Sequence, residues 1–194
     1  MIRTISALAA VALASSVALA AQPSRHAPVP DSLISEIKAW ANDPVVIQAI
    51  KEQNAKHASL SQDDIDRLDK QWRAETRTFT RRPLIDSVLG RPLSAYLKTV
   101  KARAGGLYNE IFVMDNKGLN VGQSDVTSDY WQGDEAKWQK TFLAGSDAIF
   151  VDEVDFDEST QTYQSQVNIS IADPSSNTVI GAVTVGVNVD EIQE

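Results

Sequence analysis

Residues 111–139 read IFVMDNKGLNVGQSDVTSDYWQGDEAKWQ, and this stretch says most about the fold. Its apolar start continues the alternation of residues 108–114 and predicts a strand. Asp115-Asn116-Lys117-Gly118 follows as a tight turn, in which glycine can take a positive φ. Residues 119–123 predict a short second strand, so the two strands form a hairpin. A polar connection and a predicted helix come next.

Three more strands are predicted near the end of the chain. Residues 148–156, 163–172 and 178–189 alternate apolar and polar side chains, and the last two form a hairpin around the turn at 173–177. The chain ahead of the first strand lacks this period-2 pattern. The strands are therefore expected to form one antiparallel sheet.

The register of the last hairpin divides its side chains between two faces. A turn centred on Ser175 would set Val167 opposite Val183 and Gln166 opposite Thr184. Valines and isoleucines then share one face, which we expect to pack on helices. The other face carries amides, hydroxyls and glycine. Such a face suits either the floor of a polar pocket or a surface open to solvent.

The segment 31–106 predicts helices. Asp43-Pro44 combines an N-cap aspartate with proline at the first helical position, and Ser61 can cap a later helix. Apolar side chains recur at helical spacing from Leu93 until Gly105-Gly106 stops the pattern. We therefore expect a helical region ahead of the sheet.

Residues 1–20 have the pattern of a secretory signal peptide. Arg3 supplies a positive start, an alanine-rich apolar stretch follows, and Ala18-Leu19-Ala20 offers a cleavage site. Residues 21–30 contain three prolines and predict a linker. We expect an exported protein that is periplasmic or secreted.

The composition narrows the possible partners. The net charge is −8 and there is no cysteine. Disulfides, thiolate nucleophiles and cysteine metal ligands are therefore excluded. An acidic chain is a poor partner for nucleic acid. No stretch after the signal peptide approaches the ~20 apolar residues of a membrane-spanning helix. We expect no nucleic-acid binding and no membrane insertion.

The polar connection contains the candidate ligand-binding groups. Residues 130–143 predict a helix capped by Asp129 or Ser128, which would set Trp131, Asp134 and Trp138 on one helix face. Two indoles beside a carboxylate are either core packing or the wall of a small-molecule pocket with a polar anchor. An amine would suit that pocket through cation–π contact.

Other chemical patterns are weaker. Asp155 and Asp157 share a predicted strand face and could hold Ca²⁺, but the spacing is not that of an EF-hand, and a solvated strand end is the alternative. The only histidines are His26 and His57, and no H-E-x-x-H motif is present. We expect no catalytic residue, no cofactor and no assigned metal ligand.

The hairpin at 111–123, the connection with its Asp129-Tyr130 pair and the closing strand VIGAVTVGVNVD resemble an extracytoplasmic Cache domain, the PDC-type, PAS-like sensor. The resemblance implies an α+β fold, with N-terminal helices packed on a five-stranded antiparallel PAS/Cache-like sheet. It assigns residues 107–194 to the sensor domain. The arginine motif that follows the Asp-Tyr pair in amino-acid-binding members is absent here.

In this family the ligand lies on the sheet face opposite the helix, beneath the connection after the second strand. The predicted ligand-binding residues are Ser124, Asp125, Asp129, Tyr130, Trp131, Asp134, Trp138, Gln166, Asn168 and Thr184. Tyr130, Trp131 and Trp138 would form the walls of the site. Asp129 and Asp134 would be its polar anchors, and Gln166, Asn168 and Thr184 would form its floor. The resemblance implies a sensor that passes its state to a membrane receptor or kinase, and the chain could pair as a homodimer.

Three other functions stay open. A docking protein without a small ligand would have a filled or collapsed pocket. A Ca²⁺-stabilised binding module would lose stability on chelation. A hydrolase would need two close carboxylates in a cleft, at least one with a perturbed pKa.

Overall fold

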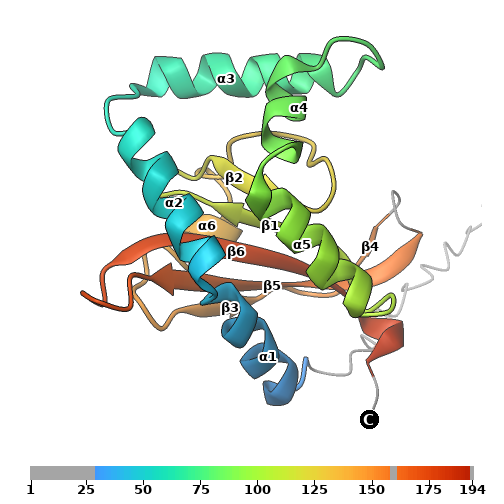
Figure 1. The fold of residues 1–194 in the computed structure, drawn as a ribbon. Coiled ribbons are helices and arrows are strands. Elements are labelled where there is room, and N and C mark those ends of the chain that lie inside the picture. The colour runs from blue at the N-terminus through green and yellow to red at the C-terminus, as the bar shows by residue number, and fades with distance from the viewer. Residues whose placement is uncertain (1–28, 158–160, 193–194) are drawn as a thin grey trace, which may run out of the picture.

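The computed structural model describes residues 29–157 and 161–192. The predicted signal peptide, residues 1–20, lies outside the described residues, as do residues 21–28 of the predicted linker. Within the described ranges, no helix has the length and apolar character needed to cross a membrane. The fold combines a layer of helices with one antiparallel sheet (Figure 1).

The sheet has the strand order β2-β1-β6-β5-β3 within the described residues, and β4 also pairs with β5. The strands are β1 (Tyr108–Met114), β2 (Asn120–Gln123), β3 (Ile149–Val151), β4 (Asp155–Asp157), β5 (Thr162–Ala172) and β6 (Val179–Asn188). All neighbouring pairs are antiparallel. The predicted α+β class and the antiparallel sheet are confirmed.

The sheet has six strands rather than five, because the strand predicted at 148–156 is divided. Its two halves, β3 and β4, pair in turn with β5 and occupy the same edge. Between them the Asp152 carboxylate accepts the backbone N–H of Glu153 at 2.9 Å. An aspartate that binds the next backbone N–H competes with the strand ladder, so the ladder breaks at this point.

Helices form in the predicted region ahead of the sheet, and two of them begin at the predicted caps. Their bounds are α1 (Asp31–Ala41), α2 (Pro44–Lys56), α3 (Gln62–Glu75), α4 (Pro83–Leu89), α5 (Pro92–Arg103) and α6 (Ala136–Gln139), with a 3-10 turn η1 (Val189–Glu191). The Asp43 carboxylate accepts from Val45 N–H at the start of α2. Ser61 and Asp64 form a capping box at the start of α3. The predicted caps are therefore confirmed.

One sheet face packs on α1, α2 and α5, of which α2 and α5 cross in front of the strands in Figure 1. Ile37, Ile50 and Leu97 come from these helices and are fully buried. They belong to one hydrophobic cluster with Val167 on β5 and Val185 on β6. The predicted apolar face is thus the helix-packed face.

A second cluster joins α3 and α4 to the connection that follows β2. Trp72 of α3 stacks on Tyr130 with ring centroids 5.2 Å apart and an interplanar angle of 18°. The Trp72 indole also donates to Thr127 O at 2.9 Å. The helical region therefore supports the connection as well as the sheet.

The predicted register of the β5–β6 hairpin is wrong by two residues. Val167 pairs with Val185 and Gln166 pairs with Gly186, rather than with Val183 and Thr184. The shift is even, so every side chain keeps its predicted face.

The turn explains the shift. Asn177 takes a positive φ of 54°, and the Asp173 N–H donates to Thr178 O at 2.8 Å. The register also slips between Ile171 and Ala172. The turn therefore centres one residue later than Ser175, which moves each cross-strand partner by two.

Candidate functional site

The sheet face opposite the helices buries polar side chains. Asn168 on β5 and Thr184 on β6 are fully buried, and the Thr184 hydroxyl donates to Asn168 Oδ1 at 2.7 Å. The connection of residues 124–148 covers this face through Trp138, which packs on an apolar cluster of β1 and β6. That cluster consists of Phe112, Met114 and Ala182. The alternative of a solvent-open face is therefore wrong here.

A cluster of amides lies at the β2 end of this face. The Asn120 Nδ2 group donates to Gln123 Oε1 at 3.1 Å, to Thr127 Oγ1 at 2.8 Å and to Asp129 O at 3.3 Å. The Gln132 amide Nε2 donates to the backbone and side-chain oxygens of Asp129. Because both donating groups face oxygens, the orientations of the Asn120 and Gln132 amides are fixed. We call these five residues the amide cluster.

The amide cluster holds three of the four buried polar side-chain atoms that lack a hydrogen-bond partner in the described residues. They are Asn120 Oδ1, Gln123 Nε2 and Gln132 Oε1, and the fourth, Trp40 Nε1, belongs to α1. The three side chains are at most 1% exposed. A buried polar atom without a partner costs about 1–3 kcal/mol. The cluster thus presents one donor and two acceptors that a bound molecule could satisfy.

Asp129, a predicted anchor, shares an arginine with a second carboxylate. Its Oδ2 lies 3.0 Å from Nη2 of Arg73, whose Nε lies 2.6 Å from Oδ2 of Asp69. The hydrogen bond to Asp69 raises the pKa of Arg73, and the charge of Asp129 adds to this. Asp129 is therefore ion-paired, but because Arg73 serves two carboxylates, the three side chains together carry one net negative charge.

The predicted helix at 130–143 is wrong: only Ala136–Gln139 is helical. The Asp69 carboxylate accepts the backbone N–H groups of Tyr130 at 2.9 Å and of Trp131 at 3.1 Å. Trp131 also forms a β-bridge with Leu119. These contacts hold the segment extended, so Trp131, Asp134 and Trp138 do not share a helix face.

The predicted aromatic walls have separate roles. Tyr130 is buried beside Trp72, and this burial raises the pKa of its hydroxyl. The Trp131 indole donates to Lys117 O at 2.8 Å, and the Trp138 indole donates to Asp115 O at 3.1 Å. Tyr130 is therefore core, and both indoles are tied to the β1–β2 turn.

The remaining predicted residues are dispersed. The Ser124 hydroxyl accepts from Ile111 N–H at 2.8 Å and donates to Asp125, which is exposed and paired with Lys101 at 2.6 Å. Asp134 is exposed. The structure brings together Asn168, Thr184 and the covering Trp138, and separately places Asp129 in the amide cluster.

Gln166 lies at the other end of the polar face, beside a residue that sequence reasoning missed. Its Nε2 donates to Glu110 Oε1 at 3.2 Å. Burial raises the pKa of the Glu110 carboxyl, and the charge of Lys137 opposes this rise. Gln166 also lines an acidic hollow of about 610 Å³. The hollow is lined by Asp152, Glu153, Val154, Asp155, Phe156, Asp157, Gln164 and Gln166.

The described residues offer little support for calcium. They contain no group of three or more histidine, cysteine, aspartate or glutamate side chains placed to hold a metal ion. Asp155 and Asp157 both lie on β4, opposite Gln164 and Thr162 of β5.

Asn120, Gln123 and Gln132 were missed by sequence reasoning. The first two pair with Met114 and Phe112, so they lie on the polar face. Alternation across the Asp-Asn-Lys-Gly turn could have placed Asn120 there, but it would have turned Gln123, three residues later, to the other face. The register shift between Val113 and Met114 brings both to the polar face. The Gln132 contact depends on the folded connection and has no such signal.

No protein-family model matches this chain, and no curated protein matches it. Solved structures do match this chain. The sensory domain of the Campylobacter jejuni chemoreceptor Tlp3 matches with 14% identity over 81% of this chain and 63% of that chain, at a TM-score of 0.40. The sensor domain of the Vibrio cholerae histidine kinase DctB matches with 14% identity over 81% and 57%, at a TM-score of 0.36.

The Escherichia coli DcuS sensor domain matches with 21% identity over 64% of this chain and 91% of that domain, at a TM-score of 0.37. The chain spans about 60% of the length of the Tlp3 and DctB domains. All three structures are sensor domains, the class named by the sequence resemblance. Their TM-scores are low, so the fold is assigned from the strand order of this chain.

Proposed function

We propose that this chain is an exported sensor that reversibly binds a small, hydrogen-bonding molecule on the polar sheet face, beneath residues 124–148. One observation carries the proposal: three unpartnered polar atoms in the amide cluster, on Asn120, Gln123 and Gln132. A matching ligand would offer one acceptor to Gln123 Nε2 and donors to the other two atoms. Small apolar-lined sites in proteins gain specificity from a few such groups.

The charges around the cluster disfavour an anionic ligand. Arg73 is shared by Asp129 and Asp69, so these three side chains together carry one net negative charge, which repels a lone anion. An amine fits this charge as well as a neutral ligand does, although Asp129 is ion-paired and Asp134 is exposed. Amides, polyols and amino acids have the required combination of donors and acceptors.

The signal would pass through the connection to α3. Asp69 and Arg73 of α3 bind the connection at Asp129, Tyr130 and Trp131. A ligand beneath the connection would favour one placement of these contacts over another, which shifts the population of α3 arrangements. The receiver in this proposal is a membrane receptor or kinase, with a homodimer as one route of transmission.

A second function, docking without a small ligand, has one observation in its favour. Trp138 packs on Phe112 and Met114 and so covers part of the polar face. Ligand binding therefore requires the connection to move or a ligand small enough for the amide cluster alone. We propose no catalytic role, because the buried carboxyl of Glu110 is hydrogen-bonded to Gln166 rather than to a second carboxylate.

A thermal-shift panel tests the proposal. The purified protein is heated with amides, polyols, amino acids, amines, carboxylates, and Ca²⁺ with and without chelator. A ligand that binds only the native state raises the melting temperature saturably. We expect a rise with one class, lost in Gln123→Leu and kept in Gln62→Leu, an exposed residue of α3. A folded protein that responds to nothing in the panel contradicts the proposal and favours docking.

A further inference from the structure

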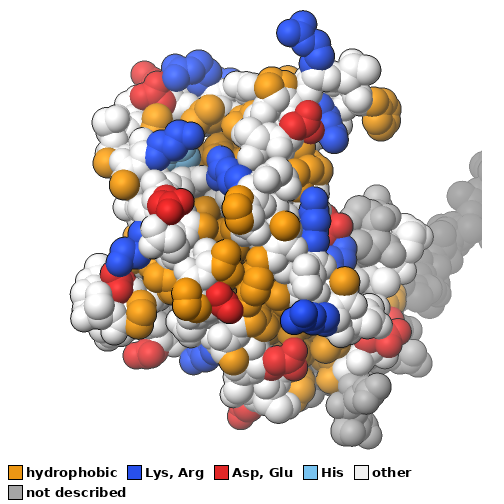
Figure 2. All heavy atoms as spheres, viewed as in Figure 1, with side chains coloured by type: hydrophobic (Ala, Val, Ile, Leu, Met, Phe, Trp, Pro, Cys, Tyr) orange, Lys and Arg blue, Asp and Glu red, His pale blue; other side chains and the backbone are white. Residues whose placement is uncertain are grey.

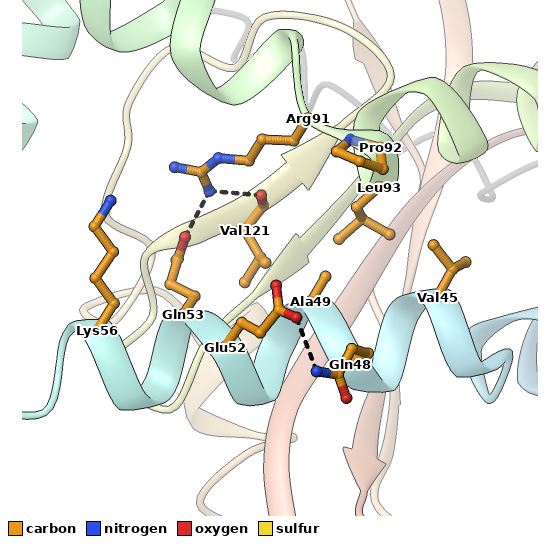
Figure 3. Close-up of a pocket in the computed structure, with 10 residues that line it drawn as sticks. All are labelled: Val45, Gln48, Ala49, Glu52, Gln53, Lys56, Arg91, Pro92, Leu93 and Val121. Atoms are coloured by element: carbon orange, nitrogen blue, oxygen red, sulfur yellow. Dashed lines mark hydrogen bonds between the residues drawn. The ribbon is translucent and has the colours of Figure 1, made fainter.

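A groove opens between α2 and α5, on the side of the sheet opposite the amide cluster (Figure 3). Its volume is about 450 Å³. Apolar side chains from both helices and from β2 line its length, namely Val45, Ala49, Leu93 and Val121. Hydrophobic side chains also gather between these helices in the space-filling view, with Lys and Arg side chains above them (Figure 2). The groove can therefore hold the apolar part of a small molecule.

Arg91 stands at one end of the groove without an acidic partner. Its Nη1 donates to Gln53 Oε1 at 2.6 Å and to Val121 O at 2.7 Å, and both acceptors are uncharged (Figure 3). Among the described residues, no carboxylate lies within ion-pair distance of this half-buried guanidinium. Charges removed from water are usually paired. Arg91 is therefore a candidate partner for an anion.

A second cation lies at the same end. Lys56 lines the groove and has no ion-pair partner in the described part of the chain. The lining also contains one carboxylate, Glu52, which accepts a hydrogen bond from Gln48 Nε2 at 2.8 Å. The lining thus has an excess of positive charge at the Arg91 end, within an otherwise acidic protein.

Arg91 is held in place by a buried network. Gln53 Nε2 donates to Asp115 Oδ2 at 2.9 Å and contacts Asn120 O at 3.2 Å. The same Asp115 oxygen lies 3.0 Å from His57 Nδ1. Because Gln53 is fixed on one side and Val121 on the other, the guanidinium is positioned before any ligand arrives, which lowers the entropic cost of binding.

We propose that this groove is a second binding site, separate from the polar sheet face, for a small carboxylate that carries an apolar chain. The carboxylate pairs with Arg91, in the two-pronged geometry that guanidinium groups favour, with Lys56 nearby. The chain lies along Ala49, Leu93 and Val121. The positive charges of Arg91 and Lys56 favour an anionic ligand, and the apolar lining favours a ligand with an apolar chain.

Calorimetric titration with hexanoate tests this site, with 1-hexanol and hexylamine as matched probes. We expect saturable binding of hexanoate and at least tenfold weaker binding of the other two. Arg91→Met should weaken hexanoate binding at least tenfold, whereas Lys98→Met, an exposed change on α5, should leave it unchanged. Equal binding of hexanol and hexanoate would overturn the proposal.

A second pair of variants keeps the test valid if Arg91→Met does not fold. Ala49→Phe fills the groove, and Ala55→Phe places the same ring on an exposed position of α2 outside it. Hexanoate binding should be lost only in the first. Binding that survives Ala49→Phe but is lost in Gln123→Leu would place hexanoate on the polar face and overturn the proposal. Hexanoate binding unaffected by Gln123→Leu supports a separate groove site, whatever the outcome for the polar face.

Discussion

The two faces of the sheet come from the same strands but differ in the side chains they carry and in the elements that cover them. On the helix face, Val167 and Val185 pair with each other and pack under α1, α2 and α5. On the polar face, their neighbours Asn168 and Thr184 pair and lie under a connection whose one helix spans Ala136–Gln139. Strand alternation allows one stretch of sequence to build both. One face packs the hydrophobic core, and the other buries polar side chains.

The faces meet at the turn between β1 and β2. Asp115 is fully buried there and accepts from Lys117 N–H at 2.8 Å and Leu119 N–H at 2.9 Å. Its other oxygen contacts Gln53 and His57 of the helix layer, and its carbonyl accepts from the Trp138 indole of the polar-face cover. Asp115 therefore links both layers to the sheet.

The largest expected effect follows from that link. Asp115→Ala should lower the free energy of unfolding by about 3–5 kcal/mol, because it leaves the partners of a buried charge without their acceptor. Chemical denaturation measures this loss. Asp125→Ala, at an exposed ion pair, should change stability by less than about 1 kcal/mol. A loss at Asp115 no greater than that at Asp125 would show that the two layers do not depend on the turn.

The next prediction ranks the two faces directly. Leu97→Ala on the helix face should cost about 2–5 kcal/mol, because it leaves a cavity in a fully buried cluster. Thr184→Ala on the polar face leaves the buried Asn168 Oδ1 without this donor and should cost about 1–3 kcal/mol. Both variants are compared by denaturant midpoint. The reverse ranking would contradict the assignment of stability to the helix face.

A smaller change is expected in the amide cluster. Gln123→Leu removes an acceptor used by Asn120 and also removes an unpartnered buried donor. These effects oppose each other, so the free energy of unfolding should change by no more than about 1 kcal/mol. A loss of several kcal/mol would mean that the Gln123 amide is a structural group rather than one kept for a ligand.

The smallest effect concerns pH and the far end of the polar face. Burial raises the Glu110 pKa above its ordinary value of 4.5, so the folded state binds this proton more tightly than the unfolded chain. Its contribution to stability is full below pH 4.5 and is lost as pH rises through the raised pKa.

Glu110→Gln keeps the acceptor for Gln166 and removes this titration. The variant should melt above the wild type at pH 7 and together with it at pH 4. A variant that melts lower than the wild type at pH 7 would show that the Glu110 charge is stabilising.

Local signals in the sequence predicted much of the fold. Caps at Asp43 and Ser61, the Asp-Asn-Lys-Gly turn and the alternation of β5 and β6 depend on neighbouring residues, and each was confirmed. The error at 130–143 came from contacts between distant residues. Asp69 of α3 takes the N–H groups that a helix at 130–143 would use.

The candidate site was less predictable for the same reason. Asn168 and Thr184 follow from strand alternation, and the structure places both on the predicted face, although Thr184 pairs with Asn168 rather than with Gln166. Whether a buried amide has a partner depends on the fold of the whole connection, so the atoms of Asn120, Gln123 and Gln132 could not be singled out. The ligand-binding role of all these residues stays a prediction.

Side-chain amide NMR of the isotope-labelled protein tests the central claim most directly. The protein is titrated with the compound that gives the largest thermal shift, and the signals of Asn120, Gln123 and Gln132 are followed beside the methyl signals of Val167 and Val185. We predict that the three amide signals shift saturably while the two valines change little. Unmoved amides at saturation, with shifts confined to the helix face, would contradict the assignment of ligand binding to the polar face.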